Sequence, residues 1–316
     1  MKPILIAANP ASAMGRSRSV LERAAAWFAQ QGLHTHQLVS QYAGHFLEAL
    51  PPLLKQDWQT IVVIGGDGTL FEVINLCLDA MPRDSDTPFA TPLALIPSGT
   101  GNSFAQDLPG KNLEDYLRKA VHGTPQPVDV ARCRFSNASL SPAQAMKTRR
   151  WRKTDFYFIN VLGTGFVAEV NRRSVNFKKL GMLGYAFAVF AELAALRPYH
   201  LRLWLDGQLI ERANTFVAIC NSRYVGGNMK MAPDADIHDG FVDVIVANAI
   251  SRWELVRTFP KVFSGKHVFH PEVEVLRAHH LRIETDPPCL LTPDGELLGT
   301  TPIEVEVLPD KLRFMI

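Results

Sequence analysis

Residues 61–70 are Ile61-Val62-Val63-Ile64-Gly65-Gly66-Asp67-Gly68-Thr69-Leu70, an apolar run that ends in a glycine-rich loop. The β-branched run favours a strand buried on both faces, as in a parallel sheet. Glycines allow positive φ angles and let a polyphosphate approach the backbone without meeting a Cβ atom. The freed N–H groups, together with the N-terminus of a following helix, attract anions. We therefore predict a nucleotide-phosphate loop at Gly65, Gly66, Asp67, Gly68 and Thr69, in preference to an ordinary strand–helix turn.

Asp67 and Thr69 are the two polar residues of this loop. A carboxylate would repel a phosphate, so we expect Asp67 to meet a metal ion or the proton of an incoming hydroxyl. Thr69 is a suitable N-cap for a helix that we predict over residues 70–78, and its hydroxyl can donate to a phosphate oxygen. The spacing matches neither the Walker A motif nor the GxGxxG dinucleotide fingerprint.

Two further loops of small residues follow apolar runs. Residues 9–15 follow a strand predicted at residues 3–8, and residues 97–102 follow another predicted at residues 92–97. In a parallel sheet all three loops would lie at the carboxyl edge of the strands, where ligands bind. The sequence therefore predicts one ligand site built by three loops.

The pattern of the chain changes near residues 128–130. Strands and helices alternate over residues 1–128, which predicts an α/β fold with a doubly wound parallel sheet as a nucleotide-binding domain. Many short strands with Asp-Gly turns then follow, which predicts an antiparallel β-sandwich domain over residues 129–307. A chain of 316 residues is long enough for two such domains.

Composition excludes several function classes. The net charge of +2 at pH 7 argues against nucleic acid as a partner. The four cysteines are widely spaced, which indicates neither a zinc site nor a disulfide framework and fits a reducing cytoplasm. No signal-peptide pattern opens the sequence, and no apolar run reaches the roughly 18 residues of a membrane span, so we expect a cytoplasmic protein.

Together with residues 232–244 and Asp294-Gly295-Glu296, these motifs make the sequence resemble the diacylglycerol kinase catalytic-domain family, which includes bacterial soluble lipid kinases and sphingosine kinases. The resemblance covers nearly the whole chain. The glycine loop is shared with NAD kinases, whereas the later blocks favour the lipid-kinase branch. The resemblance implies ATP in the first domain, an acceptor site shaped by the β-sandwich, and a return of residues 308–316 to the first domain.

The resemblance also implies roles for individual residues. Those matching nucleotide contacts are Asn9, Ser40, Gly65, Gly66, Asp67, Gly68, Thr69 and Thr100. The motif Asp294-Gly295-Glu296 resembles the catalytic turn of the family, although the residues alone indicate only a type I′ turn. Glu296, Asp294 and Asp67 therefore remain alternative bases for the lipid hydroxyl. Mg²⁺ bridging the ATP phosphates is expected as well.

The block around Asp239 resembles a structural magnesium site. Its ligands would be the Asp239 carboxylate and the backbone carbonyls of Asp236 and Phe241, since oxygen ligands suit this cation. An ordinary turn at Asp239-Gly240 explains the same residues equally well.

Two positions depart from the family pattern. Ser103 stands where most bacterial diacylglycerol kinases carry an aspartate, and Val167 stands where many members do. Glu169 falls near the acidic residue with which sphingosine kinases hold their amino-alcohol head, although a solvated residue at a helix start is the simpler interpretation.

A lipid acceptor implies contact with a membrane surface. The apolar stretch at residues 183–196 could line a lipid groove or simply be core, and the basic stretch at residues 147–153 could touch anionic headgroups or be a solvated loop. We expect an ATP-dependent lipid kinase that is transiently peripheral to a membrane, with a homodimer as a further expectation. The alternatives are an NAD-kinase-like enzyme and a non-catalytic regulator, the latter motivated by Ser103.

Overall fold

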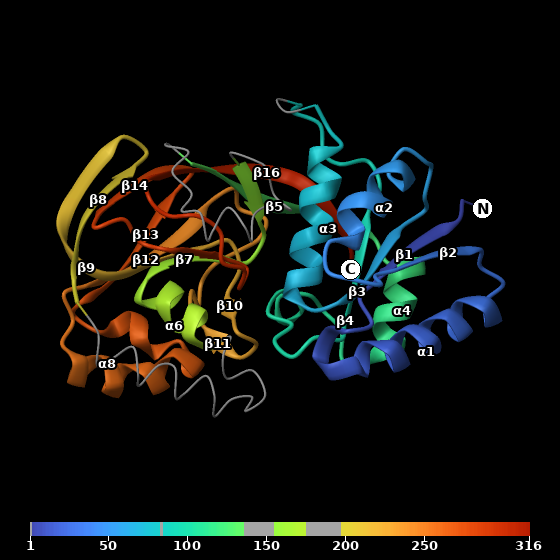
Figure 1. Ribbon diagram of the computed structural model, residues 1–316, viewed down its shortest axis with the longest axis horizontal. Coiled ribbons are helices and arrows are strands. Elements are labelled where there is room, and N and C mark those ends of the chain that lie inside the picture. Colours follow the sequence, from blue (N-terminus) through green and yellow to red (C-terminus); the bar gives the residue numbers. More distant parts are fainter. Residues whose placement is uncertain (1, 83–84, 136–154, 175–196) are drawn as a thin grey trace. The chain divides into compact units, whose positions relative to one another are not determined.

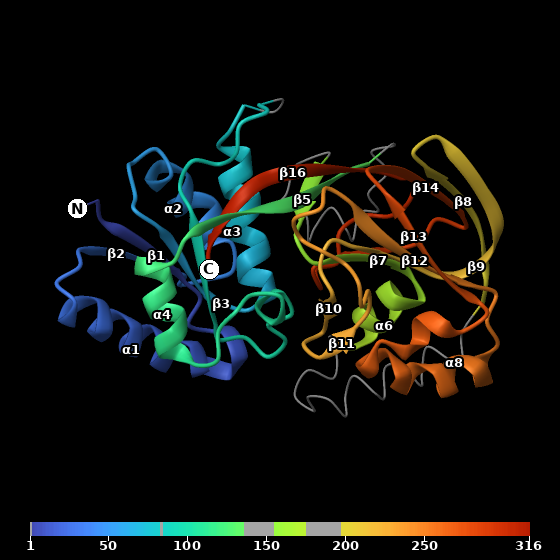
Figure 2. The same ribbon diagram turned by 180° about the vertical axis from the view of Figure 1, so that it is seen from behind.

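The computed structural model describes residues 2–82, 85–135, 155–174 and 197–316. The chain forms two compact units, one of Met1–Val130 with Leu308–Ile316 and the other of Ala131–Val307. Two strands, β5 (Pro125–Phe135) and β16 (Ile303–Met315), pass through the boundaries between the units. The predicted combination of an α/β fold with an antiparallel β-sandwich is confirmed (Figures 1 and 2).

The first unit contains a parallel sheet in the order β2-β1-β3-β4-β16. The strands are β1 (Ile4–Ala8), β2 (Thr35–Val39), β3 (Ile61–Gly65) and β4 (Leu93–Pro97), with the end of β16 paired to β4 through Phe314 and Leu93. All residues of β1 and β3 are buried, as expected for strands covered on both faces.

Helices cover both faces of this sheet. They are α1 (Arg16–Gln30), α2 (His45–Leu53), α3 (Asp67–Asp79) and α4 (Leu113–His122), with short 3₁₀ turns η1 (Ser12–Gly15) and η2 (Phe104–Gln106). Helices α1 and α4 lie on one face, and α2 and α3 pack together on the other (Figures 1 and 2). On the first face, Leu21 and Phe28 of α1 pack against alternate strand residues such as Ile6 and Val62.

Helix α3 begins earlier than the sequence suggested. Its N-cap is Gly66, whose carbonyl oxygen accepts the N–H groups of Thr69 and Leu70 at 3.0 Å each. Asp67 thus lies in the first turn, where the helix dipole favours a negative charge. The predicted capping role of Thr69 is wrong, because Thr69 is already inside the helix and its side chain is buried.

The second unit is antiparallel. Strand β9 (Gln208–Cys220) pairs with β8 (Tyr199–Leu205) through its first half, and with β12 (Val242–Asn248) and β7 (Val161–Gly165) through its second half. The remaining strands are β6 (Asp155–Phe158), β10 (Tyr224–Val225), β11 (Met229–Lys230), β13 (Val273–Ala278), β14 (His280–Asp286) and β15 (Leu291–Pro293). The order β13-β12-β9-β8-β14-β16 forms the main path, and β15 pairs with β7.

Short helices lie against this antiparallel sheet. They are α6 (Phe166–Ser174), α8 (Arg252–Thr258), η5 (Phe259–Ser264) and η6 (Lys266–Phe269). A buried apolar cluster lies between these helices and strands β9, β12 and β13. Among the described residues, no helix combines the length and apolar character that crossing a bilayer requires. The stretches at residues 147–153 and 183–196 lie outside the described residues.

Candidate active site

Hydrogen bonds join the three small-residue loops of the first unit. The Asn9 N–H donates to the Ile64 carbonyl at 3.0 Å, and the Ser98 N–H donates to the Gly65 carbonyl at 2.9 Å. The buried Ser17 hydroxyl, in the first turn of α1, lies 2.8 Å from the Ser98 hydroxyl and also reaches the loop before α1. The three loops therefore lie together at the carboxyl edge of the parallel sheet, as predicted.

Two glycines let the backbones of neighbouring loops touch. A Cβ atom on Gly66 would lie 3.0 Å from the Gly99 Cα atom, and one on Gly99 would lie 2.4 Å from the Gly66 Cα atom. A side chain at either position would push the two loops apart, even when no phosphate is bound between them. Gly65 is restricted differently, because a Cβ atom there would lie 2.4 Å from that of Thr69.

Asn102 closes the loop that follows β4. Its φ angle is 56°, and its side-chain oxygen accepts the Gly99 N–H at 2.8 Å. Its amide nitrogen donates to the Gly99 carbonyl at 3.0 Å. Thr100 lies between these residues and is exposed, so its hydroxyl is accessible to a ligand.

Asp67 links the glycine loop to the segment after β4. Its carboxylate accepts the backbone N–H groups of Ser103 at 3.0 Å and Phe104 at 3.3 Å. Burial raises the pKa of Asp67, and hydrogen bonds from these two amides and from the Ser103 hydroxyl oppose that rise. Ser103 is thus a hydrogen-bond donor to Asp67.

The other predicted nucleotide residues lie at the same edge. Asn9 follows β1 directly, and its side-chain oxygen accepts the Ala11 N–H at 3.2 Å. Ser40 follows β2, donates its N–H to the Ala8 carbonyl at 2.8 Å and is half-buried. Gly68 lies in the first turn of α3. The structure therefore brings these residues together with the glycine loop.

The motif Asp294-Gly295-Glu296 forms a tight turn in the second unit. Asp294 and Gly295 have φ angles of 45° and 87°, and the Glu296 N–H donates to the Pro293 carbonyl at 2.7 Å. These values confirm the predicted type I′ turn. The buried Asp294 carboxylate accepts three backbone N–H groups, from Ile159 at 3.0 Å, Asn160 at 2.9 Å and Val161 at 3.1 Å. Asp294 therefore fastens the turn to the connection between β6 and β7.

Glu296 is placed differently from the other two candidate bases. It is exposed, and no other residue in the described part of the chain gives its carboxylate a hydrogen bond or an ion pair. Asp67 and Asp294, in contrast, both accept backbone N–H groups. Of the three carboxylates, Glu296 is therefore the exposed one without a described partner.

Asn171 is a polar residue of this site that the sequence did not reveal. It lies on α6, and its side-chain nitrogen donates to the Gly295 carbonyl at 2.8 Å and to the Thr292 hydroxyl at 2.6 Å. Helix α6 can approach β7 closely because a Cβ atom on Gly163 would lie 2.9 Å from Val167. No local pattern signals Asn171, since its partners lie more than a hundred residues away along the chain.

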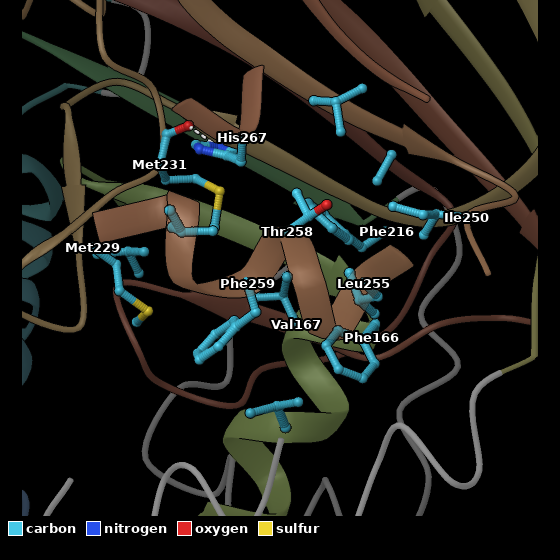
Figure 3. A pocket seen from close by; sticks show the side chains of 15 residues that line it. Phe166, Val167, Phe216, Met229, Met231, Ile250, Leu255, Thr258, Phe259 and His267 are labelled. Atoms are coloured by element: carbon cyan, nitrogen blue, oxygen red, sulfur yellow. Dashed lines mark hydrogen bonds between the residues drawn. The ribbon is translucent and has the colours of Figure 1, made fainter. Parts of the chain in front are cut away.

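An apolar pocket lies beside α6 in the second unit (Figure 3). Its space of about 680 Å³ includes some of the adjoining solvent, and nearly all of its lining surface is apolar. Phe166, Val167 and Val170 of α6 form one wall, while α8, η5 and the sheet contribute the others. His267 is the titratable residue of the lining, and its Nε2 atom lies 3.0 Å from the Met231 carbonyl oxygen. Burial lowers the pKa of His267, which favours its neutral form.

The turn around Asp239 contains a cation of its own. The Asp239 carboxylate accepts the Phe241 N–H at 3.0 Å and pairs with the Arg277 guanidinium. That guanidinium also lies 3.4 Å from the Asp243 carboxylate and 4.4 Å from the centre of the Phe241 ring. In the described part of the chain, no group of three or more Asp, Glu, His or Cys side chains lies close enough together to hold a metal ion. Arg277 is thus the cation that the structure places beside Asp239. A magnesium site made of the Asp239 carboxylate and the backbone carbonyls of Asp236 and Phe241 stays a prediction.

Glu169 and Asp243 have partners that bear on their roles. Glu169 pairs with Arg172 one turn along α6 at 2.7 Å, which agrees with the simpler interpretation of a solvated helix residue. Burial, aided by the neighbouring charges of Asp239 and Asp234, raises the pKa of Asp243 to about 6, and Arg277 opposes that rise.

Comparison with known proteins assigns both parts of the chain. Residues 3–133 match the family model of the diacylglycerol kinase catalytic domain, and residues 160–316 match that of the YegS C-terminal NAD kinase beta sandwich-like domain. The diacylglycerol kinase of Mycobacterium tuberculosis (strain H37Rv) is 30% identical over 311 residues, covering 97% of this chain and 93% of the relative. That of Bacillus subtilis (strain 168) is 27% identical over 309 residues, covering 96% and 93%.

A solved structure of a diacylglycerol kinase from Bacillus anthracis has the same fold. It matches with a TM-score of 0.69 and 22% identity, over 99% of this chain and 96% of that one. With both family models and a relative of similar length in agreement, this chain belongs to the diacylglycerol kinase family of lipid kinases.

Proposed function

We propose that this protein transfers the γ-phosphoryl group of ATP to the hydroxyl of a diacylglycerol-like or sphingoid lipid. One observation carries the lipid part of the proposal. Helix α6 lines an apolar pocket with Phe166, Val167 and Val170, and its next residue, Asn171, holds the turn that carries Glu296. A hydrocarbon chain in that pocket would bring its polar end toward the exposed Glu296 carboxylate.

The first unit is the proposed ATP-binding part. The glycine loop and the loop after β4 supply backbone N–H groups and a helix N-terminus, which attract phosphates. Asn9, Ser40 and Thr100 lie at the same sheet edge and are the proposed polar contacts to the nucleotide. Mg²⁺ would accompany ATP and neutralise charge on its β- and γ-phosphates. Asp67 keeps the two loops together through its hydrogen bonds from the Ser103 and Phe104 amides.

The second unit is the proposed acceptor part, with Glu296 as the base. The lipid oxygen forms a bond to the γ-phosphorus, and the bond from that phosphorus to the β–γ bridging oxygen breaks. ADP leaves with the bridging oxygen, and the hydroxyl proton passes to the Glu296 carboxylate. Such a carboxylate orients the alcohol and takes its proton late, because phosphoryl transfer depends mainly on positioning and charge neutralisation.

The apolar pocket is the proposed site of one hydrocarbon chain of the acceptor. The pocket is lined by aliphatic and aromatic side chains. Moving a hydrocarbon chain from water into it stabilises the complex by roughly 25 cal/mol per Å² of apolar surface that is buried. The acceptor resides in a bilayer, so the proposal includes transient contact of a cytoplasmic protein with a membrane surface. A homodimer is also proposed, and sedimentation of the purified protein tests it.

Incubation with γ-labelled ATP, Mg²⁺ and a total lipid extract tests the function. We expect label in a lipid product, identified by mass analysis, and loss of at least about 100-fold in rate for Glu296→Gln. Label on NAD without a lipid product would assign the chain to the NAD-kinase-like alternative. Wild-type lipid turnover in Glu296→Gln would remove Glu296 as the base.

A further inference from the structure

We propose that Asn171 is a positioning residue that couples occupation of the apolar pocket to the orientation of Glu296. The inference rests on the proposed function, because it assigns a task to the contact between α6 and the turn of the candidate base. It is built on two sets of contacts made by neighbouring residues of one helix.

The first set of contacts fixes the peptide that precedes Glu296. The carbonyl of the Gly295–Glu296 peptide accepts the Asn171 amide at 2.8 Å, and its N–H donates to the Pro293 carbonyl at 2.7 Å. Both polar groups of this peptide are therefore held. Gly295 has no side chain and is exposed, so nothing in its own packing opposes rotation of that peptide. The contacts that oppose this rotation are therefore those with the Pro293 carbonyl and, from outside the turn, the Asn171 amide.

The second set of contacts joins the same helix to the pocket. Phe166, Val167 and Val170 of α6 line the pocket, and Asn171 follows Val170 directly. The Asn171 amide has two N–H groups, and its two acceptors, Gly295 and Thr292, lie on the segment that carries the turn. A shift of α6 would therefore move the Gly295–Glu296 peptide, because the Asn171 side chain connects the two.

A chain in the pocket would restrain α6 and, through Asn171, the direction of Glu296. Such a restraint raises the reaction rate because groups already held in the productive arrangement need no further ordering. A misplacement of about 1 Å can lower the rate on the order of 100-fold. The two acceptors Thr292 and Gly295 both belong to the second unit, so we expect a change at Asn171 to leave ATP binding unaltered.

Asn171→Asp tests this coupling with almost no change in shape. It replaces the donating amide with an oxygen that repels the Gly295 carbonyl. We expect kcat for lipid phosphorylation to fall by about 10- to 100-fold, with the dissociation constant for ATP unchanged. Arg172→Gln, on the exposed side of the same helix, is the matched control and should keep wild-type kcat.

A double variant separates positioning from general damage to the fold. If Asn171 acts through Glu296, the variant with both Asn171→Asp and Glu296→Gln should be no slower than Glu296→Gln alone. A rate that falls by the product of the two single effects would overturn the inference.

Hydrogen exchange provides a readout that needs no catalysis. The Glu296 amide should exchange faster in Asn171→Asp than in the wild type. Monooleoylglycerol in mixed micelles should slow exchange at both α6 and this amide in the wild type, and only at α6 in the variant. Equal exchange of the Glu296 amide in the two proteins would overturn the role of Asn171, even if the wild type phosphorylated no lipid. That absence of product would instead refute the proposed function.

Discussion

The Asp294 carboxylate offers a direct way to separate a structural acid from a catalytic one. Asp294→Asn keeps the shape of the side chain and removes its charge. One oxygen remains for the Asn160 and Val161 amides, at 2.9 and 3.1 Å, but an NH₂ group now faces the Ile159 N–H that donated at 3.0 Å. Two donors then oppose each other in a buried place.

The expected cost follows from these contacts. A hydrogen bond to a charged group contributes about 1.5–3 kcal/mol, and a buried N–H group left without an acceptor costs about 1–3 kcal/mol. We therefore expect Asp294→Asn to lower the free energy of unfolding by about 3 kcal/mol. For a unit of this size that corresponds to a midpoint lower by about 6–12 °C.

Urea unfolding followed by circular dichroism measures this effect, with Glu296→Gln as the matched control. Glu296 is exposed, so its variant should lie within about 0.5 kcal/mol of the wild type while losing activity. A fully stable Asp294→Asn protein with no lipid kinase activity would refute the reasoning and make Asp294 the base.

Four other perturbations test separate parts of the structure. Gly66→Val should lower ATP affinity by more than about 10-fold, because its Cβ atom alone meets the neighbouring loop at 3.0 Å; unchanged affinity by calorimetry would remove this loop from the site. Ala247→Phe places a ring at the pocket and should raise the KM for lipid by about 10-fold, at a cost of about 1–3 kcal/mol in stability, with the ATP dissociation constant as the control. Arg277→Met removes the cation beside Asp239 and should lower the free energy of unfolding by about 0–1 kcal/mol, a loss that millimolar Mg²⁺ should restore in part. If EDTA lowers the melting temperature of the wild type, magnesium already binds at this turn. Burial raises the pKa of Asp243 from 3.8 to about 6, so its ionisation destabilises the folded form and stability should fall as pH rises from about 4 to 6; Asp243→Asn should flatten that part of the curve, and an unchanged curve would contradict the assignment.

Local pattern was enough to predict the glycine loop and its place at the carboxyl edge of the parallel sheet. A β-branched run that ends in glycines fixes the strand and the loop, and parallel strands place the loops that follow them at one edge. The start of α3 was missed because Thr69 is a better capping residue than Gly66 by type. The structure uses the Gly66 carbonyl and the Asp67 charge instead, and Thr69 packs against Gly65.

The proposed acceptor part depends on contacts between distant segments, which no local pattern contains. The partners of Asp294 are separated from it by 133 to 135 positions in the sequence, and Asn171 is separated from Gly295 by 124 positions. The turn itself was predictable from Asp294-Gly295, because these residues favour positive φ angles. The packing of β7, β15 and α6 decides which carboxylate stays exposed and which helix lies against the turn.

The three candidate bases illustrate how packing divides tasks among similar residues. Asp67 and Asp294 each accept backbone N–H groups from a neighbouring segment, and each would lose those bonds on turning toward a substrate. Glu296 loses nothing by moving, because it is exposed and longer by one methylene group. Its freedom would be a disadvantage without a fixed attachment, since a mobile base spends little time in the productive direction. The contacts of Asp294 and Asn171 resolve this conflict, because they hold the backbone of the turn. Only the side chain of Glu296, the proposed base, then remains mobile.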